Sequence, residues 1–146
     1  MKLLAKNKKA YYNYEILEKF EAGVSLLGQE VKSIKLRRIN LTAGYVVLKN
    51  NEVFLINTNV PPYQPNNTSV DYNPERPRKL LLNKSEIKYL IGKIQQKSLT
   101  LVPLKVYTNK RGKIKIEIAL AKGKRKYDKR QAIKKRDFER EQKTQF

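Results

Sequence analysis

The chain contains no cysteine, no histidine and no tryptophan, and only one of its 146 residues is methionine. Without cysteine or histidine it can form no disulfide, no thiol nucleophile, no imidazole general base and no ordinary zinc site. The thirteen acidic residues are scattered, with no Asp-x-Asp pair of the kind that holds magnesium for nuclease chemistry. We therefore expect a binding protein and not an enzyme, with no metal and no cofactor.

Acidic residues are few relative to basic ones, since 33 lysines and arginines stand against 13 aspartates and glutamates. The formal net charge is +20, the isoelectric point is near 10.1, and basic residues occur along the whole length. An excess of this size favours nucleic acid as the partner over an inert basic surface. No segment pairs a long apolar face with a basic one, and no run of about 18 apolar residues is present. We therefore expect a cytoplasmic protein that does not contact membranes.

Residues 122–146 form a basic tail with eleven lysines or arginines against four acidic residues. Its large apolar residues share no helical stripe, so the segment has no face to bury against a core. Residues 114–120, just before it, alternate between apolar and mostly charged side chains, as a half-buried strand does. We therefore divide the chain into a folded RNA-binding domain, 1–121, and a tail, 122–146, that is disordered when free and orders on binding.

The period of the apolar residues predicts short strands and two short helices in the folded domain. Residues 1–10 are expected to be frayed. Strands are expected over residues 12–26, 45–48, 53–56, 99–107 and 114–120, and helices over residues 27–34 and 84–94. The arrangement is typical of a small antiparallel closed β-barrel, similar to the oligonucleotide-binding barrels, with flanking short helices.

Prolines and asparagines mark three special positions in this pattern. Asn50 and Asn51 tolerate positive φ and predict a tight hairpin between two strands. Pro103 lacks an amide proton and therefore predicts a bulge or an edge position in its strand. Residues 59–79 hold five of the six prolines and show no periodicity, so we expect a long loop with a functional role.

Three segments, taken in order, resemble the SsrA-binding proteins, also called small protein B, which are partners of transfer-messenger RNA in bacterial ribosome rescue. They are Glu21-Ala22-Gly23 through Gly28-Gln29-Glu30-Val31-Lys32-Ser33, Arg78-Lys79-Leu80-Leu81-Leu82 with Leu99-Thr100-Leu101-Val102-Pro103-Leu104, and Gly123-Lys124 with Tyr127-Asp128-Lys129-Arg130. The resemblance runs from about residue 6 to about residue 140. The chain departs from the family pattern at Gln29, at Ala43-Gly44 and at Asn59-Val60, where the family usually has Thr, Asp-Ser and His-Ile.

The resemblance implies a division of labour between the barrel and the tail. It implies that the barrel binds the tRNA-like domain of transfer-messenger RNA and that the tail becomes helical in the empty mRNA channel of a stalled ribosome. The implied partners are transfer-messenger RNA, the ribosomal RNA of the decoding region and mRNA channel, and elongation factor Tu through the RNA. We expect a monomer. A structural ribosomal protein with a basic extension is the alternative function.

The candidate RNA-binding residues of the barrel are ten basic residues, one acid and one tyrosine. They are Lys8, Lys9, Glu30, Lys32, Lys35, Arg37, Arg38, Tyr63, Arg76, Arg78, Lys79 and Lys124. The basic side chains would neutralise phosphates, although a solvated surface role is the alternative for each of them. Glu30 would accept hydrogen bonds from base edges or order a neighbouring lysine, unless it only caps the first turn of its helix. Tyr63 would stack on an unpaired base, unless it is buried.

The resemblance also supplies the residues of the tail that would engage the ribosome. The Tyr-Asp-Lys-Arg motif is associated with the ribosomal stage and not with RNA capture. The candidates are Tyr127, Asp128, Lys129, Arg130, Ile133, Lys134 and Arg136. An isolated helix of this length is marginal in water, and phosphates would relieve the repulsion between its basic residues.

Overall fold

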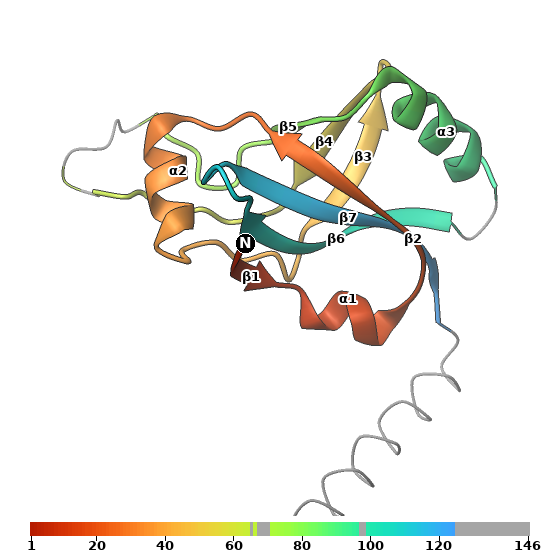
Figure 1. Cartoon of the computed structure of the whole chain (residues 1–146), viewed down its shortest axis with the longest axis horizontal. Helices are drawn as coiled ribbons and strands as arrows, with labels where there is room; N and C mark the ends of the chain where they lie inside the picture. Colours follow the sequence, from red (N-terminus) through yellow and green to blue (C-terminus); the bar gives the residue numbers. More distant parts are fainter. Residues whose placement is uncertain (65, 67–70, 97–98, 125–146) are drawn as a thin grey trace, which may run out of the picture.

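The computed structural model describes residues 1–64, 66, 71–96 and 99–124 of the chain, and seven strands and three helices lie in these ranges (Figure 1). In chain order they are β1 (Lys2–Lys6), α1 (Lys8–Asn13), β2 (Tyr14–Val24), α2 (Gly28–Lys35), β3 (Tyr45–Lys49), β4 (Glu52–Ile56), β5 (Arg78–Leu81), α3 (Lys84–Ile94), β6 (Leu99–Thr108) and β7 (Ile114–Gly123). The tail residues predicted to engage the ribosome all lie outside the described ranges.

The seven strands form one antiparallel sheet in the order β1-β6-β3-β4-β5-β2-β7, and β6 also pairs with β7. This last pairing closes the sheet, so six strands make a barrel-like ring and β1 lies outside it along the second half of β6. The ring is joined most weakly where β3 meets β6, through the single pair Val46 and Leu101. The expected mainly β, barrel-like fold with short flanking helices is confirmed.

Two groups of apolar side chains hold the sheet together. The larger group fills the ring and includes Leu55, Leu101 and Ile118, all 1% exposed or less, with Leu90 of α3 packed against it. The smaller group lies between α1 and the outer face of β6 and β7, and it consists of Ala10, Val102, Leu104, Ala119 and Ala121. Strands β6 and β7 are therefore covered on both faces, which places α1 firmly against the ring.

The prediction for the N-terminus is wrong. The segment expected to be frayed forms β1 and the first turn of α1, and the residues expected to begin a strand at position 12 belong to α1 instead. Leu4 is 5% exposed within β1, and Asn7 caps α1 by accepting the Ala10 N–H at 3.2 Å. The Asn7 amide also donates to Leu41 and Pro103 carbonyl oxygens at 3.3 and 3.0 Å. The asparagine thus fixes α1 through contacts far away in the sequence, which local periodicity does not reveal.

Other local predictions are confirmed. The hairpin between β3 and β4 turns at Asn50 and Asn51, whose φ angles are 53° and 60°. The register of β6 against β7 shifts between Pro103 and Lys105, so the proline lies at a bulge. Helix α3 begins after Asn83, whose N–H donates to Glu86 at 3.2 Å.

Gly44 lies immediately before β3, where the backbone approaches Thr58 closely. A Cβ at this position would lie 2.6 Å from Thr58 Cγ2 and 3.1 Å from the Leu41 carbonyl oxygen. We expect Gly44→Ala to lower the free energy of unfolding by about 1–3 kcal/mol, because the side chains around it must shift. Thr58→Ser removes the colliding methyl, so the double variant should recover part of the loss in urea denaturation. A single variant as stable as the wild type would contradict this close approach.

Candidate nucleic-acid interface

Four of the predicted basic residues gather on α2 and at its C-terminal end. Lys32 and Lys35 are exposed on the helix, and Arg37 and Arg38 are exposed just after it. The Arg37 N–H donates to Ile34 O at 2.8 Å and the Arg38 N–H donates to Ser33 O at 3.0 Å, which is the Schellman pattern of a helix end. We call Lys32, Lys35, Arg37 and Arg38 the α2 edge.

Arg37 adopts a backbone conformation that usually belongs to glycine. Its φ is 65°, in the left-handed region. This backbone conformation costs a residue other than glycine about 1 kcal/mol of stability. The helix end therefore keeps a long cationic side chain at a position where glycine would be more stable. The Arg37 charge lies beside the charges of Lys35 and Arg38, and the strained backbone that holds it there lowers stability.

Tyr63 of the proline-rich loop joins the α2 edge through Lys32. The Lys32 ammonium lies 5.6 Å from the centre of the Tyr63 ring, and the tyrosine is half-buried. A cation over the ring holds it in place, so one edge of the loop is fixed beside α2. The structure thus brings together two side chains that were predicted separately as a phosphate contact and a stacking platform.

Glu30 is completely buried and binds two arginines of the segment that leads into β5. Its carboxylate accepts from Arg76 Nε at 3.0 Å, from Arg78 Nε and Nη2 at 2.9 and 2.6 Å, and from the Leu27 N–H at 2.8 Å. Arg78 is 1% exposed and also donates to the carbonyl oxygens of Thr58 and Pro74 at 3.0 and 2.9 Å. We call Glu30, Arg76 and Arg78 the buried hub.

The prediction that Glu30 and Arg78 contact RNA is wrong, because neither side chain reaches the surface. Glu30 does cap its helix by accepting the N–H of Leu27, the N-cap residue of α2, but its main partners are the two arginines. The hub ties α2 to the end of the proline-rich loop. Only Arg76, whose side chain is 28% exposed, retains access to solvent among its three members.

The hub also fixes the charge of Glu30. Burial raises the pKa of this carboxyl, but hydrogen bonds from Arg76, the Leu27 N–H and Arg78 lower it more, so the pKa lies below its ordinary value of 4.5. Tyr72 donates to the Val60 carbonyl oxygen at 2.7 Å and lies against the same carboxylate, and burial raises its pKa. Val60, where the sequence departs from the family pattern, is buried, and its backbone carbonyl oxygen accepts the hydrogen bond of Tyr72 beside the hub.

A hollow of about 440 Å³ lies beside α2 and was not predicted. Its basic rim is formed by Lys35, Lys113 and Lys115, and exposed Leu81 and half-buried Val31 contribute apolar surface. The turn between β6 and β7 therefore brings two lysines next to the α2 edge. The alternating pattern of β7 predicted only that these lysines face outward. Which surface they share depends on how distant strands pair, and alternation does not reveal that pairing.

The remaining predicted residues lie elsewhere. Lys8 and Lys9 are exposed on α1, and Lys124 follows β7, where its N–H donates to Asn13 O at 2.9 Å. In Figure 1, α2 lies to the left of the ring and α1 lies below it, so the two helices occupy different places around the ring. Lys79 is exposed on β5, 3.6 Å from Glu52. The predicted basic residues thus do not form one continuous patch.

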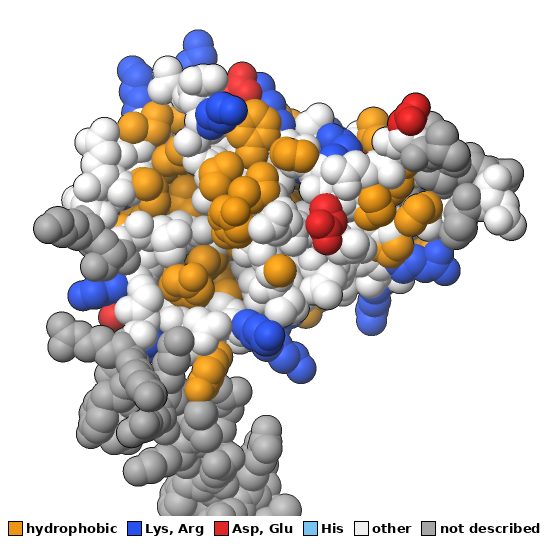
Figure 2. Space-filling view, turned by 180° about the vertical axis from the view of Figure 1, so that it is seen from behind, with side chains coloured by type: hydrophobic (Ala, Val, Ile, Leu, Met, Phe, Trp, Pro, Cys, Tyr) orange, Lys and Arg blue, Asp and Glu red, His pale blue; other side chains and the backbone are white. Residues whose placement is uncertain are grey.

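Several acidic side chains have partners within the described part of the chain. Glu18 accepts from the Tyr89 hydroxyl and Glu21 from the Tyr107 hydroxyl. Figure 2 shows exposed hydrophobic clusters on the face turned away in Figure 1, with lysines and arginines around them and few acidic side chains. Within the described ranges, no three His, Cys, Asp or Glu residues are grouped so that they could hold a metal ion. None of the helices described is long and apolar enough to cross a membrane.

The family model described as SmpB protein matches residues 4–146. The SsrA-binding protein of Thermosipho africanus is 52% identical over 140 residues, which cover 96% of this chain and 93% of that protein. The SsrA-binding protein of Persephonella marina is 53% identical over 141 residues, with 97% and 91% covered.

A solved structure described as "tmRNA-SmpB: a journey to the center of the bacterial ribosome" contains a similar chain. That chain is 42% identical to this one with a TM-score of 0.69, and the comparison covers 88% of this chain and 93% of the other. Similarity in sequence and in fold therefore extends over nearly the whole length. The chain belongs to the SmpB protein family.

Proposed function

We propose that the chain binds the tRNA-like domain of transfer-messenger RNA and delivers it to stalled ribosomes for trans-translation. The observation that carries the proposal is the match to SsrA-binding proteins over at least 96% of the chain at about half identity. The net charge of +20 suits an RNA partner. The chain acts without catalysis, in the cytoplasm, as a monomer.

The α2 edge and the neighbouring hollow form the surface for the tRNA-like domain. Lys32, Lys35, Arg37 and Arg38 supply phosphate contacts, and Lys113 and Lys115 extend the same basic region. The buried hub supports this surface from below, because it fixes α2 against the proline-rich loop that carries Tyr63. Recognition then depends on the shape and charge of folded RNA more than on a base code.

The tail completes the function on the ribosome. The described chain ends at Lys124, next to α1 and apart from α2 (Figure 1). The proposed RNA-binding surface and the end of the described chain thus lie at different places on the body. Residues 125–146 would enter the empty mRNA channel while α2 holds the RNA, with Tyr127, Asp128, Lys129, Arg130, Ile133, Lys134 and Arg136 as the engaging residues.

Charge neutralisation tests the position of the RNA surface. A variant with Lys32, Lys35, Arg37 and Arg38 all changed to glutamine should bind the tRNA-like RNA more weakly. The slope of log K against log salt should become shallower by about 0.7–0.9 for each phosphate that the variant no longer neutralises. Fluorescence anisotropy across a salt series measures both quantities.

A variant of equal charge provides the control. Lys49, Lys84, Lys88 and Lys110 are exposed on the hairpin, on α3 and on the turn after β6, and they can be changed to glutamine together. We expect this control to lose much less affinity and to keep most of the slope. Equal losses in the two variants would mean that net charge acts without a defined surface, and would contradict the proposed site.

A further inference from the structure

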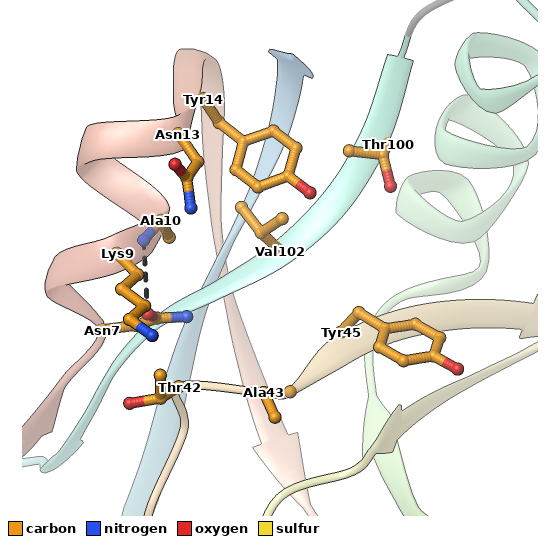
Figure 3. A pocket seen from close by; sticks show the side chains of 11 residues that line it. Asn7, Lys9, Ala10, Asn13, Tyr14, Thr42, Ala43, Tyr45, Thr100 and Val102 are labelled. Atoms are coloured by element: carbon orange, nitrogen blue, oxygen red, sulfur yellow. Dashed lines mark hydrogen bonds between the residues drawn. The ribbon is translucent and has the colours of Figure 1, made fainter. Parts of the chain in front are cut away.

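A second hollow, of about 370 Å³, lies near the point where the described chain ends (Figure 3). It is formed by α1 and its cap Asn7, the start of β2, residues 42–45 and the first half of β6. Its volume falls within the range of about 300–1,000 Å³ that is typical of sites for small organic groups. It lies on the α1 side of the ring and is distinct from the hollow beside the α2 edge.

Two tyrosines on different strands flank this hollow. Tyr14 begins β2 and lies on one side, and Tyr45 begins β3 and lies on the other, with Val102 of β6 between them (Figure 3). Tyr14 is half-buried against the apolar cluster under α1, whereas Tyr45 is 44% exposed. The lining therefore offers aromatic surface that packing inside the barrel does not use.

Several polar side chains of the hollow make no hydrogen bond within the described part of the chain, whereas Asn7 caps α1 and donates to two carbonyl oxygens. In that part, neither the Asn13 side-chain amide nor the hydroxyls of Tyr14, Tyr45 and Thr100 have a hydrogen-bond partner. An amide beside aromatic rings can pair with the donors and acceptors at the edge of a flat ring. This combination matches an unstacked nucleobase better than an aliphatic group or a simple anion.

Lys9 adds a positive charge at the rim. Its side chain lines the hollow, whereas the neighbouring Lys8 does not. Both lysines are exposed, so neither is needed for packing. Lys9 can neutralise the phosphate of a bound nucleotide. An aromatic ring that is not part of a nucleotide would bring no phosphate to the hollow.

We propose that the hollow between Tyr14 and Tyr45 binds a single unstacked nucleotide of RNA, with its base against the tyrosines and its phosphate at Lys9. The inference rests on the proposed RNA-binding function and adds a second point of contact on the α1 side. The tRNA-like domain on the α2 edge would leave this site free. The nucleotide therefore belongs to another RNA segment, which approaches from the side where the tail leaves the body.

Short single-stranded RNA tests the proposal with the full chain. The probes are fluorescently labelled hexauridylate and a hexamer with the same phosphates but abasic riboses. We expect the wild type to bind hexauridylate roughly 5- to 150-fold more tightly, because one stacked base contributes that much. Tyr45→Ala should abolish this preference, and Tyr45→Phe should retain most of it.

Matched variants separate the hollow from other aromatic and basic residues. Tyr89→Ala removes a tyrosine of similar exposure on α3, so it should leave the preference unchanged. Lys9→Gln should weaken binding of both probes more than Lys8→Gln does. Thermal denaturation of each variant verifies that it is folded.

Two outcomes would overturn the proposal. One is equal affinity of the wild type for the two probes, and the other is a preference that survives Tyr45→Ala. If either occurs while the tRNA-like RNA still binds, the base site is wrong and the proposed function stands. If the tRNA-like RNA itself fails to bind, the proposed function is wrong.

Discussion

Replacing Glu30 with glutamine is expected to lower the free energy of unfolding by about 3–5 kcal/mol. Among the described residues, Glu30 is the carboxylate that pairs with Arg78, and the two side chains are 0% and 1% exposed. A buried cation without a partner is strongly destabilising, and a domain of this size has only about 5–15 kcal/mol of stability in all. Urea denaturation followed by circular dichroism measures the loss.

Glu52→Gln is the matched control, because it removes an exposed carboxylate that lies 3.6 Å from Lys79. An exposed pair contributes at most about 1 kcal/mol, so this variant should stay close to the wild type. Glu30→Leu combined with Arg78→Leu removes both charges and should recover part of the loss. If Glu30→Gln were as stable as Glu52→Gln, the hub would not hold α2 to the loop.

The hub also predicts how stability responds to acid. Because the pKa of Glu30 in the folded protein lies below its ordinary value of 4.5, its contribution is fully present above that value. The contribution is lost as the pH falls through the lowered pKa of the folded state. Glu30→Gln cannot titrate, so its stability should fall less steeply below about pH 4.5 than that of the wild type.

Ending the chain at Lys124 is expected to abolish rescue of stalled ribosomes and to leave affinity for the tRNA-like RNA within roughly threefold, or less than 1 kcal/mol. The barrel retains every described strand in this variant, because β7 ends at Gly123 and the Lys124 N–H still donates to Asn13. The removed residues carry the basic tail proposed to occupy the mRNA channel. A reconstituted translation system with stalled ribosomes measures rescue, and anisotropy measures RNA binding.

A full-length chain with Asp128, Lys129 and Arg130 changed to alanine is the companion variant. It should also lose rescue while it keeps RNA affinity, since the resemblance assigns these residues to the ribosomal stage. Loss of most RNA affinity on truncation would contradict the division of labour between body and tail. Full rescue by the truncated chain would contradict the role of the tail.

Local patterns predicted the elements whose signals are local. The hairpin at Asn50 and Asn51, helix α2 and the bulge at Pro103 all follow from backbone preferences or short-range periodicity. The barrel-like closure followed from the number of short strands and from the family resemblance. What failed at the N-terminus was the assumption that a Lys-rich segment without periodicity is frayed, because Asn7 and Leu4 are held by partners about 35–100 residues away.

The exposure of the candidate basic side chains agrees with their sequence pattern, whereas the burial of Glu30 and Arg78 was not expected. The α2 edge was found from its charges alone, and these residues are exposed as expected. Glu30 and Arg78 were misassigned because a carboxylate among basic residues gives the same sequence signal whether it faces RNA or a buried arginine. The hollow between Tyr14 and Tyr45 was missed since its lining comes from three segments that are distant in the sequence.

The central claim is that the folded body, and not charge alone, recognises the tRNA-like domain of transfer-messenger RNA. The most direct test compares the affinity of the full chain, and of the chain ending at Lys124, for this RNA and for an unrelated folded RNA of equal length. At about 0.15 M salt, we expect a preference of about a hundredfold or more that survives removal of the tail. Equal affinity for the two RNAs would contradict the claim and would favour a ribosomal protein that binds RNA through charge.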